Sequence, residues 1–175
     1  MAGRTPPEAV NAFLEPLGRA VSCVTNAVVN VRGSYRPSPN PHSLTLNDGA
    51  AIRLSNGLLI VIDLRYRVVQ DVEPRGPWKV SVAAYFYTLA NAARQEIISY
   101  QWHPAGPSPV TLPHLHLGEA SRVGHEQVGQ AHLPTGHITV QSFLRLIVTD
   151  FGVAPRRADW DAVLTETELA FTDWG

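Results

Sequence analysis

The chain has 175 residues, a length typical of one domain, and we expect residues 1–175 to fold as a single unit. Hydrophobic residues make up 45% of the sequence and charged residues 17%, which indicates a globular protein with a substantial core. The formal net charge of -1 at pH 7 excludes a general coating protein for nucleic acid, and the one cysteine excludes an internal disulfide.

The start of the chain lacks the uninterrupted apolar core of a signal peptide. No stretch approaches about 18 apolar residues without a charge, which is the minimum for a membrane-spanning helix. We therefore expect no membrane association. Together with the cysteine usage, these features predict a cytoplasmic protein.

The first predicted element is a helix that Thr5 can cap, with Pro6 and Pro7 in its first turn. We expect it to end near Gly18–Ala20. Its apolar stripe has helical spacing and comprises Val10, Phe13, Leu14, Leu17 and Val21. Residues 24–31 are predicted to form a strand, and the proline-rich residues 36–41 a loop.

Strand patterns dominate the middle of the chain. Short strands at 44–46 and 51–54 flank the turn signal Asn47-Asp48-Gly49. Residues 58–69 and 78–88 alternate with period two, and in the second of these we expect one parity to face the core: Trp78, Val80, Val82, Ala84 and Phe86. With further candidates at 95–103 and 110–117, the count is about six strands, mostly antiparallel because their connections are short.

The period changes from 2 to 3.6 near the end of the chain. Thr139 is a candidate cap for one helix, and Asp159 for a second, after the stop signals Gly152 and Pro155. Strands followed by helices predict an α+β fold: an approximately six-stranded, mostly antiparallel sheet on which an N-terminal helix and two C-terminal helices pack.

Histidine is concentrated in one part of the chain. Six of the 7 histidines lie between residues 103 and 137: His103, His114, His116, His125, His132 and His137. The segment Pro113-His114-Leu115-His116-Leu117 places two imidazoles at i and i+2, which in a strand share one face about 7 Å apart. His114 and His116 are therefore candidate catalytic residues.

Two chemistries fit this pair of histidines. Because imidazole titrates near pH 6.5, one histidine can act as general acid while the other acts as general base on a phosphodiester, with no cofactor. Alternatively the pair can chelate zinc with a third ligand, for which the candidates are His103, His125 and Glu119; we take His103, His114 and His116 as the alternative metal set.

Other residues are candidates for substrate binding. Arg65 and Arg67 lie at i and i+2 of one predicted strand and can bind a phosphate, or they can form a solvated face with Asp63 as partner. Tyr85 and Tyr87 could stack on RNA bases, or cover a second, minor core under a helix. The long segment 118–136 has the length of a lid or binding loop.

A resemblance to a known family involves the second half of the chain. The segments Ile98-Ser99-Tyr100-Gln101-Trp102-His103 and Pro113-His114-Leu115-His116, followed by a loop and then by Phe143-Leu144 in a terminal helix, resemble the TumE-type toxins of bacterial toxin and antitoxin pairs. The resemblance implies a compact α+β protein that acts on RNA or another essential target and is held by an antitoxin-like partner. In it His114 and His116 match the family's histidine segment.

The sequence thus leaves three hypotheses. The first is a phosphodiester-cleaving or RNA-cleaving enzyme in which His114 and His116 share acid and base roles, with Arg65, Arg67, Tyr100 and His103 binding RNA or a small phosphorylated ligand. The second is a binding module whose histidines tune contact with a protein or ligand. The third is a site of three histidines around a metal with an open coordination position.

Overall fold

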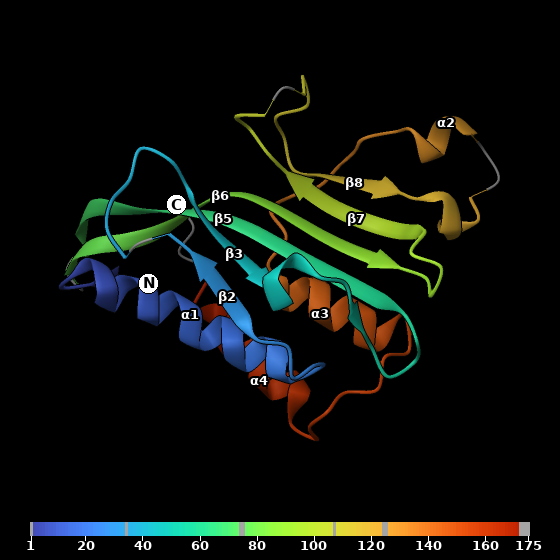
Figure 1. Ribbon diagram of the computed structural model, residues 1–175, viewed down its shortest axis with the longest axis horizontal. Helices are drawn as coiled ribbons and strands as arrows, with labels where there is room; N and C mark the ends of the chain where they lie inside the picture. The colour runs from blue at the N-terminus through green and yellow to red at the C-terminus, as the bar shows by residue number, and fades with distance from the viewer. Residues whose placement is uncertain (1, 34, 74–75, 107, 124–125, 172–175) are drawn as a thin grey trace.

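The computed structural model describes residues 2–33, 35–73, 76–106, 108–123 and 126–171 (Figure 1). The strands are β1 (Ala2–Gly3), β2 (Val29–Arg32), β3 (His42–Leu46), β4 (Ile52–Arg53), β5 (Leu59–Glu73), β6 (Gly76–Ala90), β7 (Glu96–Trp102), β8 (His114–Leu117) and β9 (Leu133–Pro134). The α-helices are α1 (Pro6–Ser22), α2 (Glu126–Gly129), α3 (Val140–Thr149) and α4 (Trp160–Leu169), and the 3-10 helices are η1 (Asn47–Gly49) and η2 (Glu119–Ser121).

All the strands belong to one antiparallel sheet. Its order is β2-β3-β5-β6-β7-β8-β9, with β1 paired to β6 and β4 paired to β5. The predicted α+β architecture, with an N-terminal helix and two C-terminal helices, is confirmed. The described chain has a 9-stranded sheet rather than about six strands. Two of the additional strands, β1 and β9, have 2 residues each and are too short to show an alternating pattern.

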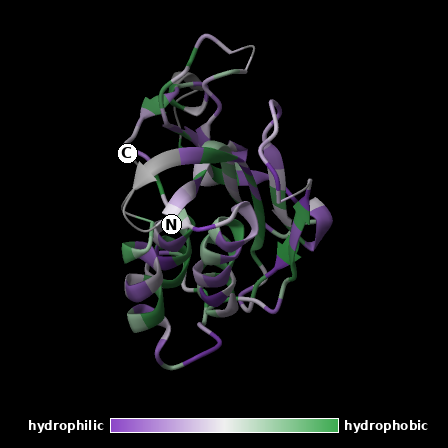
Figure 2. Ribbon diagram, turned by 90° about the vertical axis from the view of Figure 1, so that its left-hand side faces the viewer, coloured by the Kyte–Doolittle hydropathy of each residue, from purple (hydrophilic) through white to green (hydrophobic). Residues whose placement is uncertain are grey.

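Helices α1, α3 and α4 lie against the same face of the sheet (Figures 1 and 2). Their apolar stripes meet the buried strand residues in one core, which includes Phe13, Leu64 and Phe143. We call the opposite side of the sheet the outer face. Helix α1 continues to Ser22, beyond the predicted end near Gly18–Ala20, because Ala20 and Val21 are buried in this core and tertiary packing outweighs local propensity.

The long hairpin of β5 and β6 contains an irregularity that changes which side chains face the core. Arg65 pairs with Ala84 but Tyr66 pairs with Val82, so Ala83 is an extra residue on β6. A bulge of this kind reverses the alternation beyond it. The core-facing parity predicted for 78–88 is therefore wrong past the bulge, where Tyr85 is buried and Phe86 lies on the outer face.

Tyr85 and Tyr87 belong to the core rather than to a surface for stacking on RNA bases. Both are 0% exposed, and their rings stack with centroids 4.7 Å apart. Tyr87 also packs against Phe143 of α3 at 5.7 Å, and the Tyr85 hydroxyl accepts a hydrogen bond of 3.1 Å from the Ile138 amide. These contacts fix the approach of α3 to the strands. The tyrosines therefore lie under a helix, as the second interpretation expects, but in the main core rather than in a second, minor one.

Candidate metal centre

The histidines of β8 lie on the outer face of the sheet. In the register between β7 and β8, His114 pairs with Gln101 and His116 pairs with Ser99. Paired residues of antiparallel strands share a face, and the intervening Tyr100 contacts Phe143 of α3 on the core side. His114 and His116 therefore share one face, as their i, i+2 spacing predicts, and this face is the one directed away from α3.

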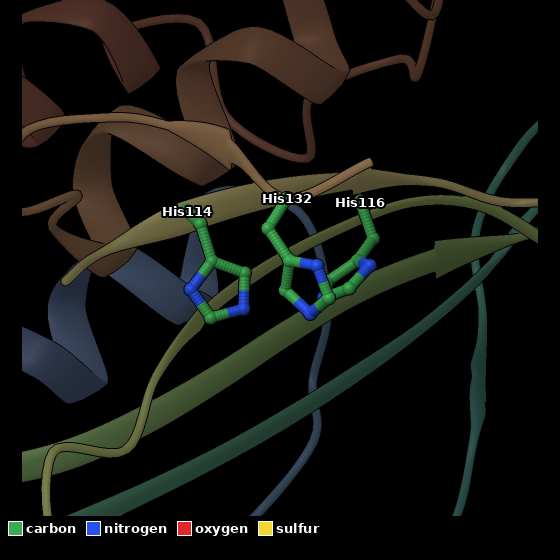
Figure 3. Close-up of side chains that lie close together, drawn as sticks. All are labelled: His114, His116 and His132. Atoms are coloured by element: carbon green, nitrogen blue, oxygen red, sulfur yellow. The ribbon is translucent and has the colours of Figure 1, made fainter. Parts of the chain in front are cut away.

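A third histidine comes from the chain just before β9. Leu115 pairs with Leu133 and His114 with Pro134, so His132 falls opposite His116 on the same face. Figure 3 shows the three imidazoles of His114, His116 and His132 gathered on one side of the strands. We call this set the histidine triad.

The triad has dimensions close to those of a metal site. The ring centroids lie 4.9 Å apart for His114 and His116, 5.0 Å for His114 and His132, and 4.4 Å for His116 and His132. One ring nitrogen from each residue lies within 4.8 Å of the other two. Nitrogens bound to one tetrahedral zinc ion, each about 2.0 Å from it, are about 3.3 Å apart, so small side-chain rotations would complete the geometry.

A backbone carbonyl orients the ring of His114. The Nδ1 atom of His114 lies 2.8 Å from the Leu112 carbonyl oxygen, so Nδ1 carries the proton and donates it to this acceptor. The remaining lone pair is then on Nε2, which is the arrangement that outer contacts give to metal-binding histidines. His114 is 1% exposed, and among the described residues its Nε2 has no hydrogen-bond partner. A buried nitrogen left unpaired costs free energy, which a bound cation would recover.

The surroundings favour neutral imidazole at His116. Its pKa is lowered first by burial, and further by the proximity of His132, His114 and His103. A histidine must be neutral to coordinate a metal ion, so the lowered pKa leaves the ligand form populated at neutral pH. The triad is graded in exposure: His114 is buried, His116 is half-buried and His132 is exposed. The site is therefore open to solvent on the His132 side.

His103 lies beside the triad but not within it. Its ring is 5.5 Å from that of His114 and stacks on Phe86 at 5.4 Å with the planes 3° apart. The alternative metal set expected from the sequence, with His103 as third ligand, thus differs from the observed cluster, which has His132 in that place. Glu119 lies exposed in η2 and is not part of the cluster, and His125 is outside the described residues.

The other candidate residues lie elsewhere. Arg65 forms a fork with Asp63 on β5, through bonds of 3.0 and 3.1 Å, and three strand intervals, about 14 Å, separate β5 from β8. Arg67 on the same strand donates to the Pro39 carbonyl. Tyr100 packs toward α3 on the core face. The structure therefore brings neither arginine nor Tyr100 to the triad.

A pocket of about 180 Å³ opens next to the triad. Two of the histidines, His114 and His132, form part of its wall. The rest comes from Pro109–Pro113, the segment that leads into β8, and from Pro134 of β9. A molecule in this pocket would touch both His114, the most buried member of the triad, and His132, the most exposed one.

Comparisons with known protein families, curated proteins and solved structures found no match. Within the described residues, none of the helices combines the length and apolar character needed to cross a membrane. The fold and the triad together define an α+β protein with a cluster of three histidines on the face of its sheet opposite helices α1, α3 and α4.

Proposed function

We propose that this protein binds one divalent transition-metal ion through His114, His116 and His132, and that this ion is zinc. The remaining coordination position would activate water for hydrolysis. The observation that carries the proposal is the convergence of the three ring nitrogens, with the unpaired, buried Nε2 of His114 among them. Imidazole nitrogens suit zinc and its neighbours in the first transition series.

Three protein ligands and one open position are the pattern of catalytic rather than structural zinc sites. The exposed His132 leaves a path for water to the ion. Zinc in such a site lowers the pKa of its bound water to about 7, so that hydroxide is available near neutral pH. The role of the triad is then to hold the ion with three neutral ligands, and the carbonyl of Leu112 keeps His114 in the required tautomer.

The test is the metal content of untagged protein purified without chelator, by elemental analysis after incubation with zinc and dialysis. We expect one equivalent in the wild type and a loss of affinity greater than about 100-fold in His114→Ala, since even the outer contacts of metal ligands are worth about 10- to 100-fold. His137→Gln is the matched control, because His137 is outside the triad and packs against Trp102. Absence of stoichiometric zinc and cobalt from the folded wild type would refute the proposal.

Cofactor-free acid and base catalysis by His114 and His116 remains a separate prediction. It is distinguished by treatment with a chelator, which abolishes metal-dependent hydrolysis and leaves a metal-independent reaction unchanged. RNA cleavage and an antitoxin-like partner, both implied by the toxin resemblance, are tested by incubating the protein with total RNA and by measuring growth when it is expressed alone. The convergence of three ring nitrogens, where acid and base catalysis needs two, favours the metal proposal over these alternatives.

A further inference from the structure

The pocket beside the triad has a composition that restricts what can bind there. Five of the residues that line it have side chains made of carbon alone: Pro109, Val110, Leu112, Pro113 and Pro134. Thr111 lines it as well. None of the described residues that line the pocket has a charged Asp, Glu, Lys or Arg side chain.

Such a lining disfavours an ionic group inside the pocket. An ion at the triad would attract an anionic head, but a phosphate or carboxylate placed in the pocket itself would lose hydration without gaining a guanidinium or ammonium partner. The arginines expected from the sequence to bind phosphate do not compensate, because Arg65 pairs with Asp63 and Arg67 with the Pro39 carbonyl. An apolar group, in contrast, gains free energy from leaving water for this wall.

The position of the histidines adds a second requirement. His114 and His132 belong both to the pocket wall and to the triad, so an ion held by the triad would lie at the edge of the pocket. A molecule with an oxygen donor at one end could coordinate the ion through that oxygen while its other end occupies the apolar space. The volume of about 180 Å³ is below the range of about 300 to 1,000 Å³ usual for sites of drug-sized ligands, so the apolar group must be small.

We infer that the substrate of this site is a small uncharged molecule with a polar, metal-coordinating carbonyl group and a short aliphatic chain, such as an ester or amide of a short fatty acid. This inference rests on the proposed metal function and specifies its substrate class. The reaction would add one water to the substrate: the water oxygen bonds to the carbonyl carbon, the bond from that carbon to the leaving oxygen or nitrogen breaks, one proton of the water goes to the leaving group, and the other is released as the product acid ionises. A metal ion held by the triad would supply the acidified water for this step. Water is the co-reactant, and no electron transfer is involved.

The experiment measures binding of alkyl hydroxamic acids to the zinc-loaded protein by calorimetry. The hydroxamate head supplies oxygen donors to the metal, and the alkyl chain is lengthened one methylene at a time from acetohydroxamate to hexanohydroxamate. We expect affinity to rise about 3- to 4-fold for each methylene until the pocket is filled, as burial of a CH₂ group predicts. Inorganic phosphate is the ionic comparison and is expected to bind more weakly than butyrohydroxamate.

Val110→Asp tests the apolar wall, because Val110 lines the pocket and is not a member of the triad. We expect this variant to retain one equivalent of zinc and to bind acetohydroxamate, but to lose the gain in affinity with chain length. Val28→Asp, at a residue that is 62% exposed and precedes edge strand β2, is the matched control and should keep the gain.

The outcomes separate the substrate class from the metal site. Zinc-loaded protein whose affinity does not change with chain length, or that binds phosphate more tightly than butyrohydroxamate, overturns the inference and leaves the metal proposal intact. Loss of the chain-length effect in Val28→Asp as well as in Val110→Asp also overturns it, since the effect then does not arise in the pocket. Protein that takes up no zinc overturns both proposals.

Discussion

His116 and His132 face each other across the last two strands of the sheet, with ring centroids 4.4 Å apart and the ring planes at 71°. His116 is half-buried in β8, while His132 is exposed beside β9. The pair depends on β9, a strand of 2 residues that holds the preceding chain in register against β8. The third ligand of the candidate site is thus positioned by one of the shortest elements in the fold.

This dependence gives the first prediction. His132→Ala should abolish stoichiometric zinc binding, as we also expect of His114→Ala, although His132 is exposed and its loss removes little packing. Because an exposed substitution changes stability by less than about 0.5 kcal/mol, the effect is separable from unfolding. Elemental analysis and the melting temperature of the metal-free variant together check it.

His103→Ala is the informative comparison for that variant. The His103 ring lies 5.5 Å from that of His114 but is not a member of the triad. We expect it to keep one equivalent of zinc. If zinc were lost from His103→Ala and kept by His132→Ala, the metal set expected from the sequence would replace the triad.

The three histidines come from two separate segments of the chain, and only one of these segments could be predicted from the sequence. The i, i+2 spacing of His114 and His116 in an apolar strand segment was sufficient to place both on one face. His132 carries no comparable signal, because Leu133–Pro134 is too short to show alternation and the sequence before it predicts only a long loop. Its position follows from a pairing between β8 and β9 that local sequence does not specify.

The same limit applies to the fold. Helices α1 and α3 and the long strands β5 and β6 have strong periodicity, and the α+β architecture was predictable from them. The bulge at Ala83 was not, since an extra residue is visible only once both strands of the hairpin are paired. It transfers Tyr85 to the core and Phe86 to the outer face, where Phe86 stacks on His103.

Zinc should stabilise the folded protein. A ligand that binds only the native state adds about 2.7 kcal/mol when its free concentration is 100 times the dissociation constant. For a chain of this size each kcal/mol corresponds to about 2–4 °C, so the melting temperature should rise on the order of 5–10 °C. Differential scanning fluorimetry of wild type and His114→Ala checks this, and an equal rise in both proteins would contradict specific binding at the triad.

We predict that the metal-free protein becomes less stable as the pH falls. Partial desolvation lowers the pKa of His137 from its ordinary value near 6.5, although its side chain is exposed, and burial lowers the pKa of His116. Between the folded and unfolded pKa values the unfolded chain binds more protons than the folded protein. The contribution of these histidines to the free energy of unfolding is therefore greatest above about pH 6.5, and it decreases as the pH falls below that value.

His137→Gln isolates one of these contributions. We expect urea denaturation of the metal-free variant between pH 7 and pH 5 to show a shallower loss of stability than the wild type. Some slope should remain, because His116 is unchanged in the variant. A slope as steep as in the wild type would show that His137 does not contribute.

The capping of α3 supports a prediction about stability. The Thr139 hydroxyl accepts a hydrogen bond of 2.9 Å from the Ser142 amide and donates one of 2.5 Å to Glu168 of α4. Thr139→Ala should lower the free energy of unfolding by about 1–2 kcal/mol, as loss of an N-cap does. Thr149→Ala, at the exposed end of the same helix, should change it by less than about 0.5 kcal/mol. Chemical denaturation of the two variants in parallel is the measurement, and equal effects would refute the capping argument.

The last prediction concerns Arg65, which the sequence made a candidate for binding phosphate. Its guanidinium is engaged by Asp63, and β6 and β7 lie between its strand and β8. Arg65→Ala should therefore leave zinc content and hydroxamate affinity unchanged, while stability changes by less than about 1 kcal/mol because the ion pair is partly exposed. Hydrolysis of a neutral short-chain ester and of a phosphodiester by wild type and Arg65→Ala compares the two substrate classes directly. A phosphodiesterase activity that is lost in Arg65→Ala would mean that the ion pair opens to bind substrate, and the ionic substrate class would then displace the uncharged one.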